Sequence, residues 1–196
     1  MKRSYNIHRW YRSAWGRYTQ ADPIGLLGGI NTYQYSDGDP IDEIDLYGLA
    51  GCPPNVIAFI NNMCQAAKTA AGENCPCRAM LIQSGFESGW GTGSTVPDNN
   101  YFGLHGEGNA GFRMSKPKNP KTKPVKLPIN KKPEDSYKQY CHRCAVYDVT
   151  YKDDSQFVTD VTHKLTFSVY TQPSYIKNIL GMMKKCDSEL RACCGK

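Results

Sequence analysis

Two hydrophobic patterns divide the chain near residue 50. After this point, apolar residues recur at three- and four-residue spacing in four stretches, as on one face of an α-helix. The expected helices run from Pro53-Pro54 to near Gly72, from about Cys77 to Glu87, from Asp153-Asp154 onward, and from Pro173 onward. Between residues 96 and 150, prolines and two alternating runs predict loops with a small β-hairpin formed by residues 123–127 and 145–149.

Residues 1–49 follow a different pattern, in which turns repeatedly interrupt aromatic residues. The turn signals leave no room for a long helix, and they are Asp22-Pro23, Gly28-Gly29, Asp37-Gly38 and Asp39-Pro40. We expect short β-strands that belong to a larger β-structure, since alone they would expose much aromatic surface. The chain thus divides into regions 1–49 and 50–196, and the second is a mainly α domain of the α+β class.

Composition limits the possible cellular locations of the protein and the classes of partner that it could bind. The 196 residues suffice for one core, and neither a signal peptide nor a membrane-spanning stretch is evident at a mean hydropathy of −0.56. We therefore expect synthesis in the cytoplasm without membrane insertion, so that a protein working outside the cytoplasm would need something else to carry it there. Ten Lys/Arg lie from Arg113 to Arg143, but no aromatic residue occurs between Phe112 and Tyr137 for base stacking. A solvated loop or attraction to an acidic cell-wall polymer is favoured over nucleic-acid binding.

Nine cysteines are many for a chain of this size. They all follow residue 51, at positions 52, 64, 75, 77, 141, 144, 186, 193 and 194. This density predicts an oxidising place of action and at least three disulfides, with one thiol left free or paired between molecules. The alternative is a zinc site at Cys75, Cys77, Cys141 and Cys144, which the unusual C-x-C spacing disfavours.

The sequence of the first region contains a specific motif. "GRYTQADPIGLLGGINTYQYSDGDPIDEIDLYGL" resembles the end of the Rhs/YD-repeat core, where a DPxGL signature precedes a variable toxin. The signature occurs a second time as Asp45-Leu46-Tyr47-Gly48-Leu49, where Leu46 stands in place of the proline. The resemblance implies a self-made cut between Leu49 and Ala50, with Asp22 and Asp45 as the cleaving acids; simple turn roles are the alternative for both.

A second candidate for chemistry is Glu87, at the end of an apolar helix beside Trp90. An apolar wall raises the pKa of a carboxyl, and glycoside cleavage needs such a proton donor near neutral pH. "ESGWG" followed by "NNYFGLHG" resembles the bacterial N-acetylglucosaminidases of the flagellar-muramidase and autolysin type. That family implies a lysozyme-like fold with a small β-lobe. It also implies substrate-binding roles for Trp90, Asn100, Tyr101, Phe102, Gly103 and His105, with His105 at the usual lysine position.

Two weaker matches follow downstream. "VKLP" resembles the family's β-lobe, but an insertion separates it from the next acids, so Glu134 and Asp135 are both candidates for a second catalytic carboxylate. "YTQPSYIKNI" resembles a segment whose tyrosine lines the catalytic cleft, which points to Tyr175.

These resemblances imply an antibacterial Rhs effector toxin that hydrolyses the β-1,4 bond after N-acetylglucosamine in peptidoglycan. No metal or cofactor is expected. The expected partners are peptidoglycan strands, a cognate immunity protein, and the Rhs shell with type VI or related secretion machinery; the expected place of action is the target-cell periplasm. The alternatives are a muramidase or lytic transglycosylase that uses the same Glu87, and a non-catalytic glycan-binding module.

Overall fold

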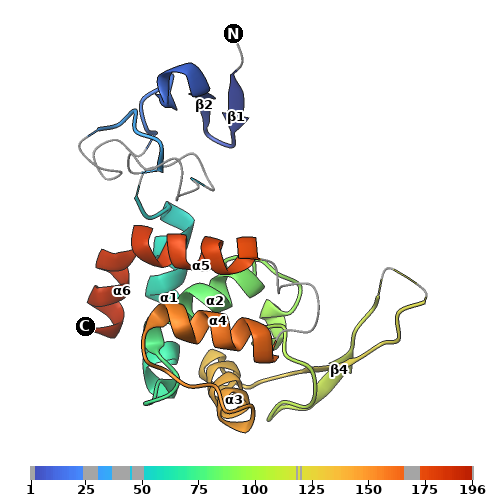
Figure 1. Ribbon diagram of the computed structural model, residues 1–196. Coiled ribbons are helices and arrows are strands. Elements are labelled where there is room, and N and C mark those ends of the chain that lie inside the picture. The colour runs from blue at the N-terminus through green and yellow to red at the C-terminus, as the bar shows by residue number, and fades with distance from the viewer. Residues whose placement is uncertain are drawn as a thin grey trace.

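In the computed structural model, the described part of the chain forms a set of helices packed around α2. It also forms two small antiparallel sheets (Figure 1). The described residues are 3–23, 31–36, 45, 51–117, 119, 121–165 and 173–195. The strands are β1 (Ser4–Asn6), β2 (Arg9–Arg12), β3 (Arg17–Tyr18), β4 (Phe112–Met114) and β5 (Lys126–Pro128). The helices are α1 (Pro54–Ala70), α2 (Cys77–Glu87), α3 (Pro133–Val146), α4 (Asp154–Leu165), α5 (Pro173–Lys185) and α6 (Asp187–Cys194).

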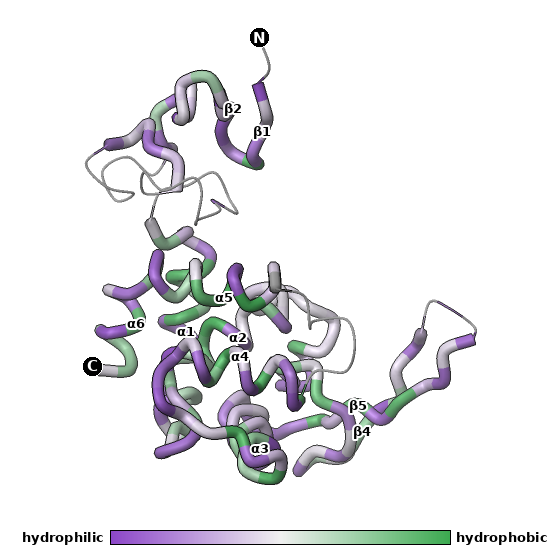
Figure 2. Tube along the Cα trace, viewed as in Figure 1, coloured by the Kyte–Doolittle hydropathy of each residue, from purple (hydrophilic) through white to green (hydrophobic). Residues whose placement is uncertain are grey.

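α2 is the central helix, and its sequence explains why. Its residues from Ala79 to Gly85 are all buried, so the helix has no solvent-facing stripe over this length. A helix of this kind is stable only in an interior. α1, α4, α5 and α6 all contact it, and Figure 2 shows hydrophobic residues gathered between these helices. The core therefore encloses α2 as far as Gly85, and Glu87 lies just beyond this buried stretch.

The four expected helices are confirmed as α1, α2, α4 and α5. No helix of the described residues is long and apolar enough to cross a membrane. The expectation for residues 133–146 is wrong, because this stretch forms α3 rather than a loop. Pro133 occupies the first helical turn, and the Asp135 carboxylate accepts a hydrogen bond from the Lys132 backbone N–H at 3.1 Å.

The expected β-hairpin is also wrong in its partner. β5 includes part of the predicted run, but it pairs with β4, with Arg113 opposite Leu127. The other predicted strand, residues 145–149, instead contains the end of α3 and the turn that follows it. β4 and β5 project from the helices as an arm (Figure 1).

Four disulfides fasten the helices, which confirms the prediction of at least three. They join Cys52 to Cys186, Cys64 to Cys193, Cys75 to Cys141, and Cys77 to Cys194. The neighbouring cysteines at the end of α6 thus bind it to both α1 and α2. Three of the four thiols in the zinc alternative are consumed, and Cys144 is left as a buried free thiol.

The N-terminal region forms the expected short strands, in the order β1-β2-β3. Its interior is ionic: the buried Arg9 guanidinium lies 3.1 Å from the Asp22 carboxylate and 3.4 Å from that of Asp45. The Tyr18 hydroxyl donates to Asp45 at 2.7 Å. Asp45 also accepts from the ammonium of Lys185, at the end of α5, at 2.9 Å. One carboxylate therefore links the N-terminal strands to the helical domain.

Candidate active site

The end of α2 is shaped by one close contact between a glycine and a tryptophan. A β-carbon on Gly85 would lie 2.2 Å from Cζ3 of Trp90, so only glycine lets the indole ring lie against the helix. The Trp90 backbone takes a left-handed φ of 56°, and its N–H donates to the Gly85 carbonyl at 2.7 Å. Phe59 and Phe86 pack on the same ring. The chain therefore turns sharply just after Glu87, and the carboxyl is placed at the edge of the core.

Glu87 is held in surroundings that favour its protonated form. Burial raises the pKa of this carboxyl above its ordinary value, and a hydrogen bond from Tyr175 opposes part of that rise. The Tyr175 hydroxyl donates to Oε1 of Glu87 from the first turn of α5. The result is a carboxylic acid that keeps its proton closer to neutral pH and has a neighbour able to stabilise it after proton loss.

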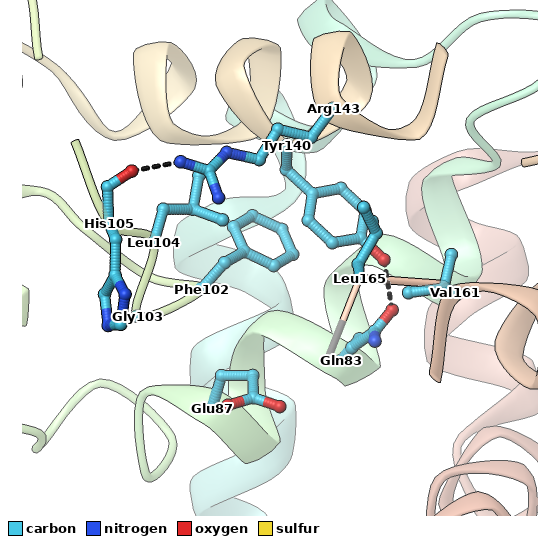
Figure 3. A pocket seen from close by; sticks show the side chains of 10 residues that line it. All are labelled: Gln83, Glu87, Phe102, Gly103, Leu104, His105, Tyr140, Arg143, Val161 and Leu165. Carbon is cyan, nitrogen blue, oxygen red and sulfur yellow. Dashed lines mark hydrogen bonds between the residues drawn. The ribbon is translucent and has the colours of Figure 1, made fainter. Parts of the chain in front are cut away.

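Glu87 opens into a pocket of about 200 Å³. The pocket is lined by Gln83, Glu87, Phe102, Gly103, Leu104, His105, Tyr140, Arg143, Val161 and Leu165 (Figure 3). α2 supplies the carboxyl and an amide, α3 supplies a hydroxyl and a guanidinium, and α4 supplies aliphatic side chains. Among the described lining residues, Glu87 is the one carboxylic acid.

The loop opposite α2 is rigidly tied. The buried Asn100 side chain donates to the Leu104 carbonyl at 3.0 Å and accepts from the Leu104 N–H at 2.9 Å. Gly103 takes a left-handed φ of 57°, which glycine adopts without strain. The Phe102 ring stacks on Tyr140 with ring centres 4.0 Å apart. The loop therefore presents a fixed, partly aromatic wall to the pocket.

The structure brings together only part of the expected site. Glu87 contacts Tyr175, and Phe102, Gly103 and His105 line the pocket with Glu87. Trp90, Asn100 and Tyr101 lie outside the lining and support it: Trp90 packs on α2, Asn100 ties the loop, and the Tyr101 N–H donates to the Ser136 hydroxyl at 3.1 Å.

The two candidates for a second acid lie elsewhere, at the start of α3. Asp135 accepts from the Lys132 N–H, and Glu134 lies 3.6 Å from the Lys138 ammonium. Neither lines the pocket around Glu87. Their catalytic role stays a prediction.

The three candidates for self-cleavage are placed only in part. Asp22 and Asp45 both lie against Arg9, so the structure brings the two acids to one buried centre. Leu49 and the expected cut after it lie outside the described residues.

Three polar pocket residues escape the sequence motifs. Tyr140 and Arg143 lie on α3, which the hydrophobic pattern does not predict. Gln83 could have been found, because it precedes Glu87 by four residues on a predicted helix and so shares its face.

Known proteins resemble this chain in sequence and in fold. The probable deoxyribonuclease RhsA of Dickeya dadantii is 33% identical over 94 residues, which are 48% of this chain but 6% of that relative's length. This match confirms the resemblance to Rhs proteins. The chain therefore spans only a small fraction of this curated relative.

Solved structures match the fold of the helical domain. The catalytic domain of an autolysin from Listeria monocytogenes has a TM-score of 0.57 at 16% identity, covering 71% of this chain and 88% of that one. A type VI secretion system effector–immunity complex from Pseudomonas protegens also has a TM-score of 0.57, at 15% identity, covering 71% and 96%. These likenesses confirm the mainly helical α+β fold. A family model described as mannosyl-glycoprotein endo-beta-N-acetylglucosaminidase matches residues 64–188, more than half of the sequence, and the chain belongs to this glucosaminidase family.

Proposed function

We propose that this domain hydrolyses the β-1,4 bond after N-acetylglucosamine in peptidoglycan, with Glu87 as the general acid. The observation that carries the proposal is the half-buried Glu87 carboxyl, which opens into the pocket and accepts a hydrogen bond from Tyr175. Membership of the glucosaminidase family supports the same reaction class.

The chemistry follows from the raised pKa of Glu87. The protonated carboxyl gives its proton to the glycosidic oxygen as the bond from that oxygen to the anomeric carbon breaks, so the leaving sugar departs as a neutral alcohol. Water then adds to the anomeric carbon, and the proton that it releases passes to a carboxylate or to solvent, from which Glu87 regains its proton. Tyr175 donates to the new Glu87 carboxylate and stabilises it. This reaction consumes only water.

A second carboxylate would take the water's proton or stabilise the positive charge that develops on the sugar. Glu134 and Asp135 are our candidates, and both would have to act from outside the pocket described above. Their position in the first turn of α3, shortly after β5, supports testing them. The Lys131 backbone N–H, just before α3, donates to the side chain of Asn109, in the loop before β4, at 2.9 Å.

The Rhs resemblance supports an antibacterial effector. In this proposal a type VI or related machine delivers the protein, the disulfides form in the target periplasm, and an immunity protein protects the producing cell. The matching solved structure from Pseudomonas protegens is itself an effector–immunity complex, which supports the same arrangement here.

Digestion of purified peptidoglycan tests the function. The oxidised protein should release fragments with N-acetylglucosamine at the reducing end, as identified by mass spectrometry after reduction. Fragments that end in reducing N-acetylmuramic acid would instead show a muramidase, and 1,6-anhydro ends a lytic transglycosylase. Glu134→Gln and Asp135→Asn should be assayed in parallel, and we expect one to lose far more activity than the other. A wild-type protein that binds the glycan but releases no fragments would instead indicate a non-catalytic binding module.

A further inference from the structure

Gln83 is a buried amide in the wall of the pocket. It lies one helical turn before Glu87 on α2, so both side chains leave the same face of the helix. The residue is only 2% exposed, yet it lines the pocket. A buried amide needs hydrogen-bond partners for its oxygen and for its nitrogen, because leaving either unpaired costs free energy.

Tyr140 fixes which end of the amide faces the pocket. Its hydroxyl donates to Oε1 of Gln83 (Figure 3). Burial raises the pKa of Tyr140 well above its usual value, so this hydroxyl stays protonated and remains the donor. Oε1 must therefore be the acceptor, and the nitrogen lies on the side away from Tyr140. No group in the described part of the chain accepts a hydrogen bond from that nitrogen.

The surroundings of this nitrogen select a particular kind of ligand. Much of the pocket that Gln83 lines is apolar, with Phe102, Leu104, Val161 and Leu165 in its wall. An N–H donor beside an apolar wall suits a neutral carbonyl oxygen that carries a methyl group. The 2-acetamido group of an N-acetylated sugar has both parts.

We propose that the side-chain nitrogen of Gln83 binds the carbonyl oxygen of the 2-acetamido group on the sugar whose bond is cleaved. One helical turn separates Gln83 from Glu87, about 5–6 Å along the axis. The acetamido group is attached to the carbon next to the anomeric carbon, so a sugar with its glycosidic oxygen at Glu87 can reach Gln83. This inference rests on the proposed function and adds what selects N-acetylated sugars.

Binding measured in a Glu87→Gln background tests this without turnover. The probes are a peptidoglycan tetrasaccharide of alternating N-acetylglucosamine and N-acetylmuramic acid, and the same tetrasaccharide with its glucosamine residues N-deacetylated. We expect calorimetry to show about tenfold tighter binding of the acetylated probe, the upper range for one hydrogen bond. Adding Gln83→Met should remove most of this preference. Gln65→Met, an exposed glutamine on α1, is the matched control and should keep it.

A merely structural role for Gln83 predicts a different result. Gln83→Met would then weaken both probes equally, with the preference intact, and this outcome would overturn the proposal. Tyr140→Phe offers a second route if Gln83→Met does not fold, because it frees the amide to rotate; the preference should fall severalfold, and an unchanged preference counts against the proposal. If the wild-type protein digests walls but the Glu87→Gln protein binds both probes equally, the role of Gln83 is rejected and the proposed hydrolysis stands. Preference without any wall digestion rejects the proposed hydrolysis alone.

Discussion

The Tyr175 hydroxyl donates a hydrogen bond to Oε1 of Glu87 across a sequence separation of 88 residues. Glu87 ends the central helix, and Tyr175 lies in the first turn of α5, which packs on that helix. The geometry of the candidate acid thus depends on helix packing as well as on its own motif. This relationship separates two roles that can be tested independently: the transferable proton and its orientation.

Glu87→Gln tests the transferable proton. The amide keeps the size of the side chain but cannot donate a proton to the leaving oxygen, so the rate should fall on the order of 10²–10⁴. Turbidity loss of purified cell walls measures the rate, and toxicity after periplasmic expression should vanish with it. A folded variant that digests walls at the wild-type rate would remove Glu87 from the mechanism.

The same variant also predicts a change in how stability depends on pH. Burial raises the pKa of Glu87 in the folded state, so its stabilising effect is complete below the unfolded pKa and is lost as pH rises through the folded pKa. Glutamine does not titrate. The stability of Glu87→Gln relative to wild type should therefore increase as pH rises through that window. Melting temperatures of the variant and the wild type, measured from acid to alkaline pH, show whether their difference changes in this direction.

Tyr175→Phe tests the orientation. The Tyr175 hydrogen bond lowers the pKa of Glu87, so removing it should raise that pKa further. A general acid works only while protonated, and the alkaline limb of the kcat/KM profile should therefore move to higher pH. The maximal rate should fall, because the new carboxylate loses a donor. A profile with an unmoved alkaline limb would contradict the assigned contact.

Gly85→Ala tests the packing of Trp90. The added β-carbon would overlap the indole ring, which Phe59 and Phe86 hold in place, so we expect a loss of about 1–3 kcal/mol in unfolding free energy. Activity should fall with it, since the ring fixes the turn after Glu87. Gly181→Ala in α5 is the matched control, because its β-carbon would meet nothing within 4 Å. Chemical denaturation of both variants gives the comparison, and equal stabilities would contradict it.

Local motifs predict the part of the site that one segment builds. The apolar run, the glycines and the tryptophan after Glu87 all lie within a short stretch, so its helix end can be read directly. Tyr140 and Arg143 escape prediction because α3 buries tyrosines and a cysteine rather than aliphatic residues, which weakens its periodicity. The place of Glu134 and Asp135 depends on how the β4–β5 arm joins α3, which is a tertiary property.

The cysteines allow a count to be predicted but not a pairing. The adjacent Cys193 and Cys194 go to different helices, and only the packing of α6 decides which partner each one meets. Their number alone predicts disulfides; the structure adds that Cys144 is the free thiol.

A thiol count tests this pairing. Oxidised protein should show one free thiol in denaturant, and peptide mapping should place the label on Cys144. The folded protein should react slowly, because Cys144 is 1% exposed and burial raises its pKa to about 12. Reduction should cost about 2–4 kcal/mol for each disulfide lost. Nine reactive thiols in active protein would reject the four pairs.

The buried ion pair between Asp45 and Lys185 leads to a prediction about processing. When the chain is expressed behind the Rhs shell, the expected cut falls between Leu49 and Ala50, so N-terminal sequencing of the released domain should begin at Ala50.

Asp45 and Lys185 would then lie on different fragments. Their side chains are only 1% and 8% exposed and their charged atoms lie 2.9 Å apart, so the pair is little screened by salt. The two fragments should therefore elute together in gel filtration after the cut. Lys185→Met should release the N-terminal fragment, because Asp45 then loses this ion pair with α5. Lys68→Met, which changes an exposed lysine on α1, is the control and should not release it. A different first residue would refute the cut site, and a fragment that stays bound to Lys185→Met would refute the role of the ion pair.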